Sequence, residues 1–154
     1  MKPCADLSEP SPLTDADYAR LAGFRHALRS FLNFSEAAAL GVGVGGQQYQ
    51  ALLVVRAMPA AQEMTVSELA RQLLIKHHSA VGLVDRLVDQ GLLLRQASRD
   101  DGRKVELRLT GKGKRVLGRL VGLHRHELEH AGPRLSMWLG QVSRTAESMP
   151  EGEP

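Results

Sequence analysis

Apolar side chains recur at helical spacing through the first quarter of the chain. Thr14, followed by acidic residues, is a favourable helix start, and the run GVGVGG at 41–46 is a favourable end. The pattern predicts a helix over 14–40 and a second one over 47–58, closed by Pro59. The first helix has no apolar partner nearby in the sequence, so we expect it to pack against another subunit. Its apolar stripe consists of Tyr18, Leu21, Phe24, Leu28, Phe31 and Leu32.

Two short amphipathic segments follow, and both have clear start signals. Thr65 and Glu68 have the spacing of a capping box, in which each side chain binds the other residue's backbone amide. The helix that they begin is predicted to end near Ile75. A second helix begins at residues 76–79 and ends at Gly91, where glycine permits the backbone to turn. Two short helices joined by a tight turn are typical of a helix-turn-helix.

The next segment has the pattern of a β-hairpin. Residues 92–97 (LLLRQA) and 105–109 (VELRL) are predicted strands. The second alternates apolar and charged residues, as a half-buried strand with its polar side outward does. Between them lies SRDDGRK, in which Asp101-Gly102 is a favoured turn pair and three of the seven residues are basic. A hairpin with a cationic tip after a helix-turn-helix is typical of a wing.

The last third of the chain is again predicted to be helical. Thr110 caps a long helix, and Pro133 is expected to begin a final helix that contains Trp138. The segments 1–13 and 148–154 are expected to be flexible tails. The predicted fold class is mostly α, with a small β-hairpin (α+β), in a single domain over 14–147.

Charge and composition narrow the function. Residues 71–119 contain twelve basic and five acidic side chains (net +7), whereas 1–70 and 120–154 are each net −2. A local cationic excess is what a polyanion-binding face needs, although a solvated basic face has the same signature. The single cysteine, Cys4, excludes a disulfide within one chain. Because the sequence has neither a long apolar run nor a signal-peptide pattern, we expect a cytoplasmic protein that does not bind membranes.

Residues 65–113 resemble the DNA-binding core of the multiple-antibiotic-resistance regulator (MarR) family. The matching stretches are TVSELARQL, SAVGLVDRLVDQGLL and RDDGRKVELRLTGKG. The resemblance implies a winged helix-turn-helix homodimer, with dimerisation helices over 14–40 and 110–147 and a DNA-binding lobe over 47–109. It also implies a transcription regulator, expected to be a repressor, that binds a pseudo-palindromic operator in double-stranded DNA and is released by a small aromatic effector. It implies no cofactor and no enzymatic activity.

The resemblance assigns candidate DNA contacts to the second helix of the helix-turn-helix. Its first residues, 76–79, are expected at base edges in the major groove, where His77 and His78 contact either bases or phosphates. Val81 and Gly82 stand where many family members have a polar and a large basic residue. Base recognition is therefore expected to depend on the histidine pair instead. Alternatively, Gly82 is expected to let the helix backbone approach the DNA closely.

The resemblance also assigns roles in the wing. Arg103 matches an arginine that enters the minor groove, and Asp101 matches an aspartate that pairs with a nearby arginine, for which Arg86 is the candidate. Arg99 and Lys104 are expected to contact phosphates. The full candidate set is Lys76, His77, His78, Ser79, Gly82, Arg86, Arg99, Asp101, Arg103 and Lys104.

Two alternatives rest on HELEH at 126–130, a literal HExxH motif, which on a helix sets two histidines one turn apart for zinc. A zinc hydrolase is the remote alternative, because the 24 residues that follow contain no His, Asp or Cys as a third ligand. A metal-sensing regulator is the other. Its ligands would come from His26, His124, His126, Glu127 and His130, although helical His and Glu residues are commonly just solvated.

The resemblance further implies a ligand pocket between the dimerisation helices and the DNA-binding lobe. Five apolar residues of the two predicted N-terminal helices are candidates to line it. For each of them, ordinary core packing is the competing interpretation. They are Phe24, Leu28, Phe31, Tyr49 and Leu53.

Overall fold

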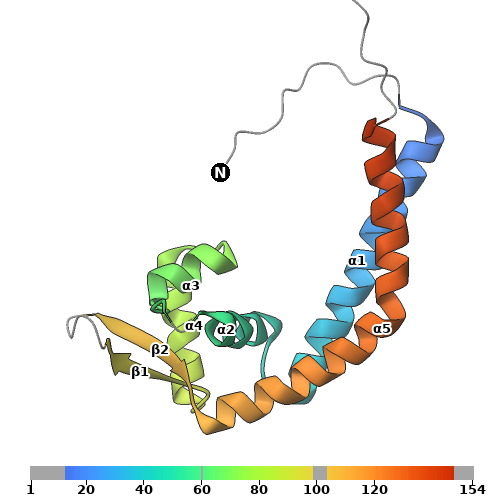
Figure 1. The fold of residues 1–154 in the computed structure, drawn as a ribbon. Coiled ribbons are helices and arrows are strands. Elements are labelled where there is room, and N and C mark those ends of the chain that lie inside the picture. Colours follow the sequence, from blue (N-terminus) through green and yellow to red (C-terminus); the bar gives the residue numbers. More distant parts are fainter. Residues whose placement is uncertain (1–12, 60, 99–103, 148–154) are drawn as a thin grey trace, which may run out of the picture. The chain divides into compact units, whose positions relative to one another are not determined.

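The computed structural model describes residues 13–59, 61–98 and 104–147, which form five helices and two strands (Figure 1). Their order is α1 (Asp15–Gly41), α2 (Gly46–Ala57), α3 (Val66–Leu73), α4 (His77–Asp89), β1 (Leu93–Ala97), β2 (Val105–Leu109) and α5 (Gly111–Glu147). The chain divides into a helix-pair unit, residues 1–32 with 127–154, and a winged-helix unit, residues 33–126. The predicted fold class, mostly helical with one small hairpin, is confirmed. The predicted tails lie outside the described residues, apart from Leu13.

Hydrogen bonds at the helix starts follow the capping signals in the sequence. Thr14 and Asp17 bind each other's backbone amides at the start of α1, at 2.9 and 3.3 Å. Thr65 Oγ1 accepts from the amide of Glu68 at 3.2 Å. The predicted return contact of Glu68 is wrong, because its carboxylate accepts from Arg71 and Gln72 instead. The capping box at Thr65 is therefore only half formed.

The turn between α3 and α4 is longer than predicted, because it takes in residues 74–76. Helix α3 ends at Leu73, because Leu74 takes a left-handed conformation with φ 55° and ψ 39°. The Ile75 amide then donates to the carbonyl of Ala70 at 3.0 Å, which closes the helix end. Gly91 ends the α4 segment as predicted, with φ 67°.

The two strands form an antiparallel hairpin with Leu93 opposite Leu109 and Ala97 opposite Val105. The loop before α3 is bonded to the edge of this sheet, because the Leu107 amide donates to the carbonyl of Met64 at 2.8 Å. The prediction that the polar side of β2 faces outward is wrong at Glu106. Its side chain is buried and accepts from Arg108, whereas Val105 is 47% exposed.

The core of the winged-helix unit lies between α2, α3, α4, the hairpin and the start of α5 (Figure 1). Helix α4 contributes one face to it, and the start of α5 closes it below the hairpin. Burial of these Leu and Val side chains, at about 25 cal/mol per Å² of apolar surface, is the main term that holds the unit together. The largest fully buried side chains are Leu52, Met64, Leu69, Leu83, Val84, Leu87, Leu93, Leu107 and Leu120.

A buried histidine joins α1, α2 and α5 within this unit. His124 is 6% exposed, and its ring stacks on Tyr49 with the centroids 4.4 Å apart. Its Nδ1 donates to the carbonyl of Leu120 and its Nε2 bonds the hydroxyl of Ser35, both at 2.7 Å. Both ring nitrogens are thus satisfied in an otherwise apolar site.

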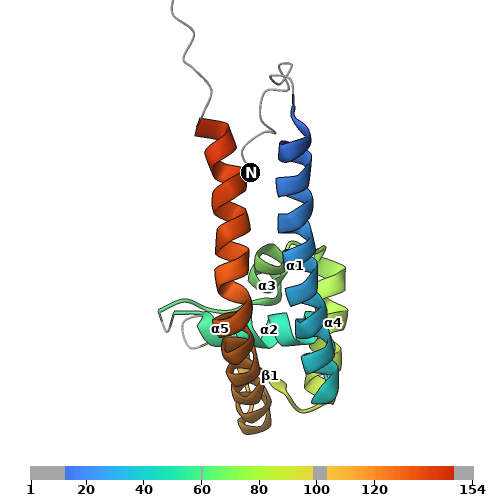
Figure 2. The same ribbon diagram turned by 90° about the vertical axis from the view of Figure 1, so that its right-hand side faces the viewer.

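In the helix-pair unit, α1 and α5 run antiparallel beside each other (Figure 2). Trp138 lies against α1 at Gly23, where an added Cβ would be 2.6 Å from the indole ring. The predicted helix start at Pro133 is wrong, because α5 runs unbroken through it. Proline removes one backbone donor, and the neighbouring hydrogen bonds hold the helix on either side. Within the described part of the chain, no helix has the length and apolar character that a membrane span needs.

Candidate DNA-binding surface

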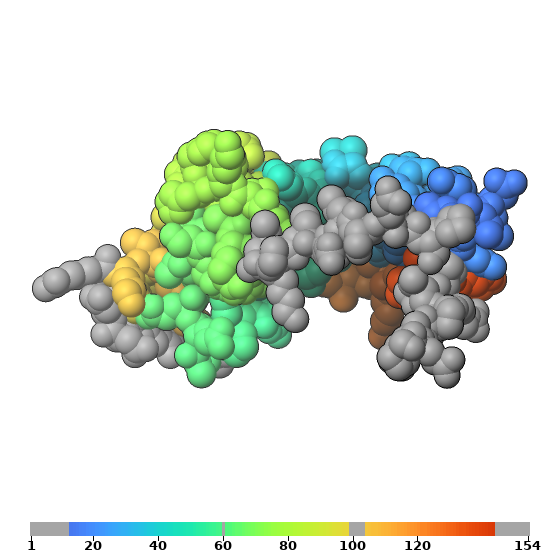
Figure 3. Space-filling view, turned by 90° about the horizontal axis from the view of Figure 1, so that it is seen from above, coloured from blue at the N-terminus to red at the C-terminus, as the bar shows by residue number. Residues whose placement is uncertain are grey.

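The first turn of α4 presents polar side chains to solvent. Lys76, His77, His78 and Ser79 are all exposed, and the buried face of the helix begins at Ala80. In the space-filling view, α3 and α4 (green to yellow-green) form one continuous surface (Figure 3). The predicted recognition-helix residues therefore share an accessible helix start, where side chains can reach the base edges of a major groove.

His77 is held by a residue that the sequence reasoning did not single out. Its Nδ1 lies 3.3 Å from Oγ of Ser67, near the start of α3. This contact orients the ring from across the helix-turn-helix. The serine has no signal of its own in the sequence, because it lies in the capping segment and meets His77 only after the two helices pack.

The outward face of α4 beyond this turn contains Gly82, Asp85 and Arg86. Asp85 pairs with Arg95 of β1, with Oδ1 and Nη2 2.6 Å apart. Arg86 is exposed, and its Nη1 lies 3.6 Å from the position that a Cβ on Gly82 would take. Arg95 is thus an ion-pair partner of α4.

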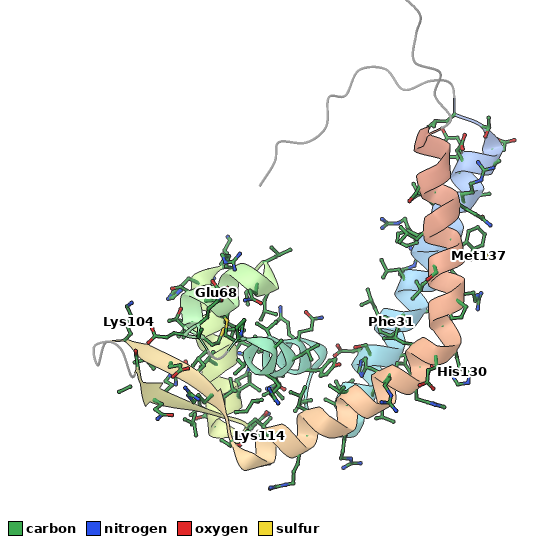
Figure 4. All side chains as sticks on the ribbon, in the orientation of Figure 1. Phe31, Glu68, Lys104, Lys114, His130 and Met137 are labelled. Carbon is green, nitrogen blue, oxygen red and sulfur yellow. The ribbon has the colours of Figure 1, made fainter. Side chains whose placement is uncertain are left out.

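The wing is described only in part. Lys104 is exposed at the tip end of β2 (Figure 4). Arg99, Asp101 and Arg103 lie outside the described residues, so their predicted roles stay predictions. Below the tip, the Ser98 amide donates to the carbonyl of Lys104 at 2.9 Å, and the Ser98 hydroxyl donates to Glu63. The base of the wing is therefore tied to the loop before α3.

The end of α4 is fixed to the start of α5. Thr110 Oγ1 donates to the carbonyl of Gly91 at 2.7 Å and accepts from the Gly113 amide at 2.9 Å. Lys112 Nζ donates to the carbonyl of Gln90 at 2.8 Å. These bonds satisfy carbonyls at the end of α4, and a cation there is favoured by the helix dipole. The orientation of α4 is thus coupled to the first turn of α5.

The exposed face of α3 carries a compact ion pair. Arg71 Nε and Nη2 donate to the two carboxylate oxygens of Glu68 at 2.9 and 2.6 Å, and Gln72 donates to one of them at 2.7 Å. Hydrogen bonds from Arg71 and then Gln72 lower the pKa of Glu68 to about 2. Arg71 is therefore engaged within α3.

The five predicted pocket residues fall in both units. Phe31 lines a hollow of about 200 Å³ in the helix-pair unit, with Ala27 and His130 among its neighbours. Phe24 is half-buried, and Leu28 and Leu53 are 38% and 39% exposed. Tyr49 is buried against His124 in the winged-helix unit. That all five line one pocket stays a prediction.

A larger cleft, of about 570 Å³, lies in the winged-helix unit between the end of α2 and β2. None of the predicted pocket residues lines it. Its walls combine apolar and cationic side chains, including Val55, Arg56, Met58, Met64, Arg108 and Lys114. Lys114 marks its α5 side in Figure 4.

The residues of the HExxH motif do not form a metal centre with other described residues. Across the described ranges, no group of three His, Cys, Asp or Glu side chains is placed to hold a metal ion. His126 and His130 are exposed on α5, as helical residues on a polar face commonly are. Both nitrogens of His124 are engaged by Leu120 and Ser35, so that residue is no free ligand.

A model of the MarR family matches residues 42–104, which span α2, the helix-turn-helix and β1 but end before β2. The fold is similar to that of the multiple antibiotic-resistance repressor (MarR) of Listeria monocytogenes (20% identity, 90% of this chain and 97% of that chain, TM-score 0.60). Over residues 42–104, the chain is thus similar to the MarR family.

Two other solved structures are similar in fold. The transcriptional repressor CouR, solved with a 23-mer DNA duplex, is 27% identical over 88% of this chain and 93% of that chain, with a TM-score of 0.60. AbsC, a MarR family regulator from Streptomyces coelicolor, is 17% identical over 79% of this chain and 82% of that chain, with a TM-score of 0.67. No curated protein sequence matches the chain. All three of these solved structures are of transcriptional regulators or repressors.

Proposed function

We propose that this protein is a homodimeric repressor of the MarR family that binds a pseudo-palindromic operator through α4 and the wing. The observation that carries the proposal is the first turn of α4, where Lys76, His77, His78 and Ser79 are exposed together. The local charge supports it, because residues 71–119 are net +7 and phosphate binding needs such an excess. The similar CouR was solved with DNA, which supports a DNA partner for this chain.

The helix-pair unit supports the dimer. Eight large apolar side chains of this unit are 38–62% exposed, and exposed apolar surface of this kind commonly marks an interaction site. A second copy of the unit is the simplest cover for them. Two recognition helices related by a two-fold axis then enter successive major grooves, so the half-sites are expected about 34 Å apart. The eight are Leu13, Tyr18, Leu21, Leu28, Leu32, Leu128, Met137 and Leu139.

The proposal is tested by selecting bound fragments from a random DNA pool and measuring affinity by gel shift at two salt concentrations. A two-fold-related motif is expected, together with a steep loss of affinity at high salt. Arg103→Ala is expected to weaken operator binding by about 1–3 kcal/mol. Arg56→Ala removes a cation outside the proposed surface and serves as the matched control. The proposed DNA-binding function would be contradicted if the affinity did not depend on salt concentration, or if no motif were selected from the pool.

Regulation by a small aromatic ligand is the second part of the proposal. A ligand that favours a lobe spacing unsuited to one turn of DNA would release the operator. The hollow at Phe31, which combines apolar and charged side chains, supports it. Aromatic acids and phenols are screened for release of labelled operator, and Phe31→Ala is expected to weaken the response while leaving ligand-free DNA binding intact. A full response in Phe31→Ala places the ligand elsewhere, with the larger cleft beside β2 as the next candidate.

A further inference from the structure

Gly82 stands in the middle of α4 without any backbone reason for a glycine. Its φ is not positive, so every residue type can adopt its conformation. A Cβ at this position would meet no core atom. Within 4 Å it would find Nη1 of Arg86 alone, at 3.6 Å. Because glycine costs about 1 kcal/mol relative to alanine inside a helix, the residue weakens α4 for no gain in packing.

The space beside Gly82 is used by Arg86. Arg86 lies one helical turn further along the exposed face, and helical side chains lean towards the N-terminus of their helix. Its guanidinium therefore extends back along α4, towards the first turn that carries His78. A large side chain at position 82 would take up that space. The glycine lets the arginine lie flat against the helix.

The neighbouring charges leave this guanidinium available. Asp85 is adjacent in sequence, but its carboxylate is paired with Arg95 of β1 at 2.6 Å. Among the described residues, Arg86 forms no ion pair. Arg95 thus neutralises Asp85. Asp89, three residues beyond Arg86 on α4, is also exposed but forms no ion pair with Arg86 among the described residues.

We propose that Arg86, extended over the gap at Gly82, is a base-reading residue of this regulator and that it selects guanine. A guanidinium presents paired donors in a planar fork, which match O6 and N7 of guanine in the major groove. Gly82 acts as a positioning residue, because its missing side chain sets the path of the arginine. The proposal rests on the proposed function and adds a specificity determinant to it.

The test compares the DNA motifs selected from a random pool by the wild type and by variants of the two residues. The wild type is expected to select a guanine at one fixed position in each half-site. Arg86→Lys keeps the charge and loses the fork, so it is expected to lose that guanine and to bind the wild-type motif about tenfold more weakly. Gly82→Leu fills the gap and is expected to lose the same guanine.

Two controls sharpen the test. Gly82→Ala adds a Cβ at ordinary van der Waals distance from Arg86, so it is expected to keep the guanine and to raise helix stability. The double variant Gly82→Leu/Arg86→Lys is expected to bind no more weakly than the worse single variant, because both changes remove one contact. Circular dichroism and the melting temperature confirm that each variant is folded.

Several results would overturn the inference. Arg86→Lys or Gly82→Leu could select the wild-type motif unchanged, which would show that the arginine supports the fold or contacts phosphate. Asp101→Asn could lose the same guanine as Arg86→Lys, which would show that the arginine acts by holding the wing. If the wild type selects a motif but either of these results is obtained with the variants, the proposed function stands and the inference about Arg86 fails. If the wild type selects no motif, both fail.

Discussion

Gly113 lies in the first turn of α5, directly against the chain that leaves α4. An added Cβ would be 2.1 Å from the carbonyl oxygen of Leu92, a backbone atom that cannot turn aside. That carbonyl also accepts from the amide of Thr110 at 3.1 Å, so moving it would disturb the junction between α4 and α5.

Gly113→Ala is therefore expected to destabilise the protein by about 1–3 kcal/mol, as overpacking does. Gly111→Ala is the matched control, because its Cβ would meet only the flexible end of Arg115 at 3.6 Å. The free energy of unfolding in urea measures both. Equal free energies of unfolding for the two variants would show that the junction between α4 and α5 accommodates the added methyl group without loss of stability.

Glu68 provides a pH-dependent contribution at the residue scale. Hydrogen bonds from Arg71 and Gln72 lower its pKa from 4.5 to about 2. A carboxylate with a lowered pKa stabilises the folded state above its unfolded pKa, and the contribution disappears as the pH falls towards the folded value. The stabilisation is expected to be complete above about pH 4.5 and lost near pH 2.

The urea midpoints of the wild type and Glu68→Gln should consequently differ at pH 6 and converge as the pH falls to 2. Arg71→Gln removes the larger cause of the lowered pKa of Glu68. The urea midpoint of this variant is therefore expected to depend less on pH over the same range. If the urea midpoints of the wild type and Glu68→Gln still differ at pH 2, Glu68 stabilises α3 by packing rather than by charge.

At the scale of elements, His124 joins α1 to α5 inside the winged-helix unit. Its two hydrogen bonds, to Ser35 and Leu120, are both 2.7 Å. His124→Phe retains a ring to stack on Tyr49 but leaves the Ser35 hydroxyl and the Leu120 carbonyl without this partner. A loss of about 1–3 kcal/mol in unfolding free energy is expected, as for an unsatisfied buried polar group.

Ser35→Ala provides the second arm of a double-mutant cycle. Since Ser35 and His124 share one hydrogen bond, the double variant is expected to be less destabilised than the sum of the two single ones. Additive losses would mean that the bond between the two helices contributes nothing of its own.

The boundaries of α3 and α5 show where element-scale prediction fails. The apolar pattern correctly located both helices, because spacing and capping are local properties. It placed the end of α3 too late, since nothing in the type of Leu74 indicates a left-handed conformation. It also broke α5 at Pro133, although a proline can be carried inside a helix whose neighbouring turns are intact.

At the scale of the whole molecule, the exposed apolar face of the helix-pair unit predicts self-association. Leu21 and Leu139 are 50% and 52% exposed, and a charge at either is costly only if a partner covers it. Sedimentation equilibrium is expected to give a dimer for the wild type and a shift towards monomer for Leu21→Glu or Leu139→Glu.

Leu74→Glu is the control for this experiment. Leu74 is 92% exposed but belongs to the winged-helix unit, so its substitution is expected to leave the mass unchanged. A wild-type monomer, or a dimer that tolerates both glutamates, would contradict the dimer interface proposed for the helix-pair unit.

The sequence alone predicted the two short helices, the hairpin and the helical segments on either side of them. These depend on apolar spacing, capping residues and turn residues such as Thr110 and Gly91, which act within a few positions of one another. Only the tertiary structure decided which side chains meet. His124 bonds Ser35 across 89 positions, and Ser98 bonds Glu63 across 35. Such pairs form when separate elements pack, and their residue types give no sign of it beforehand. The same holds for the ion pair of Asp85 with Arg95, which forms when α4 packs beside β1.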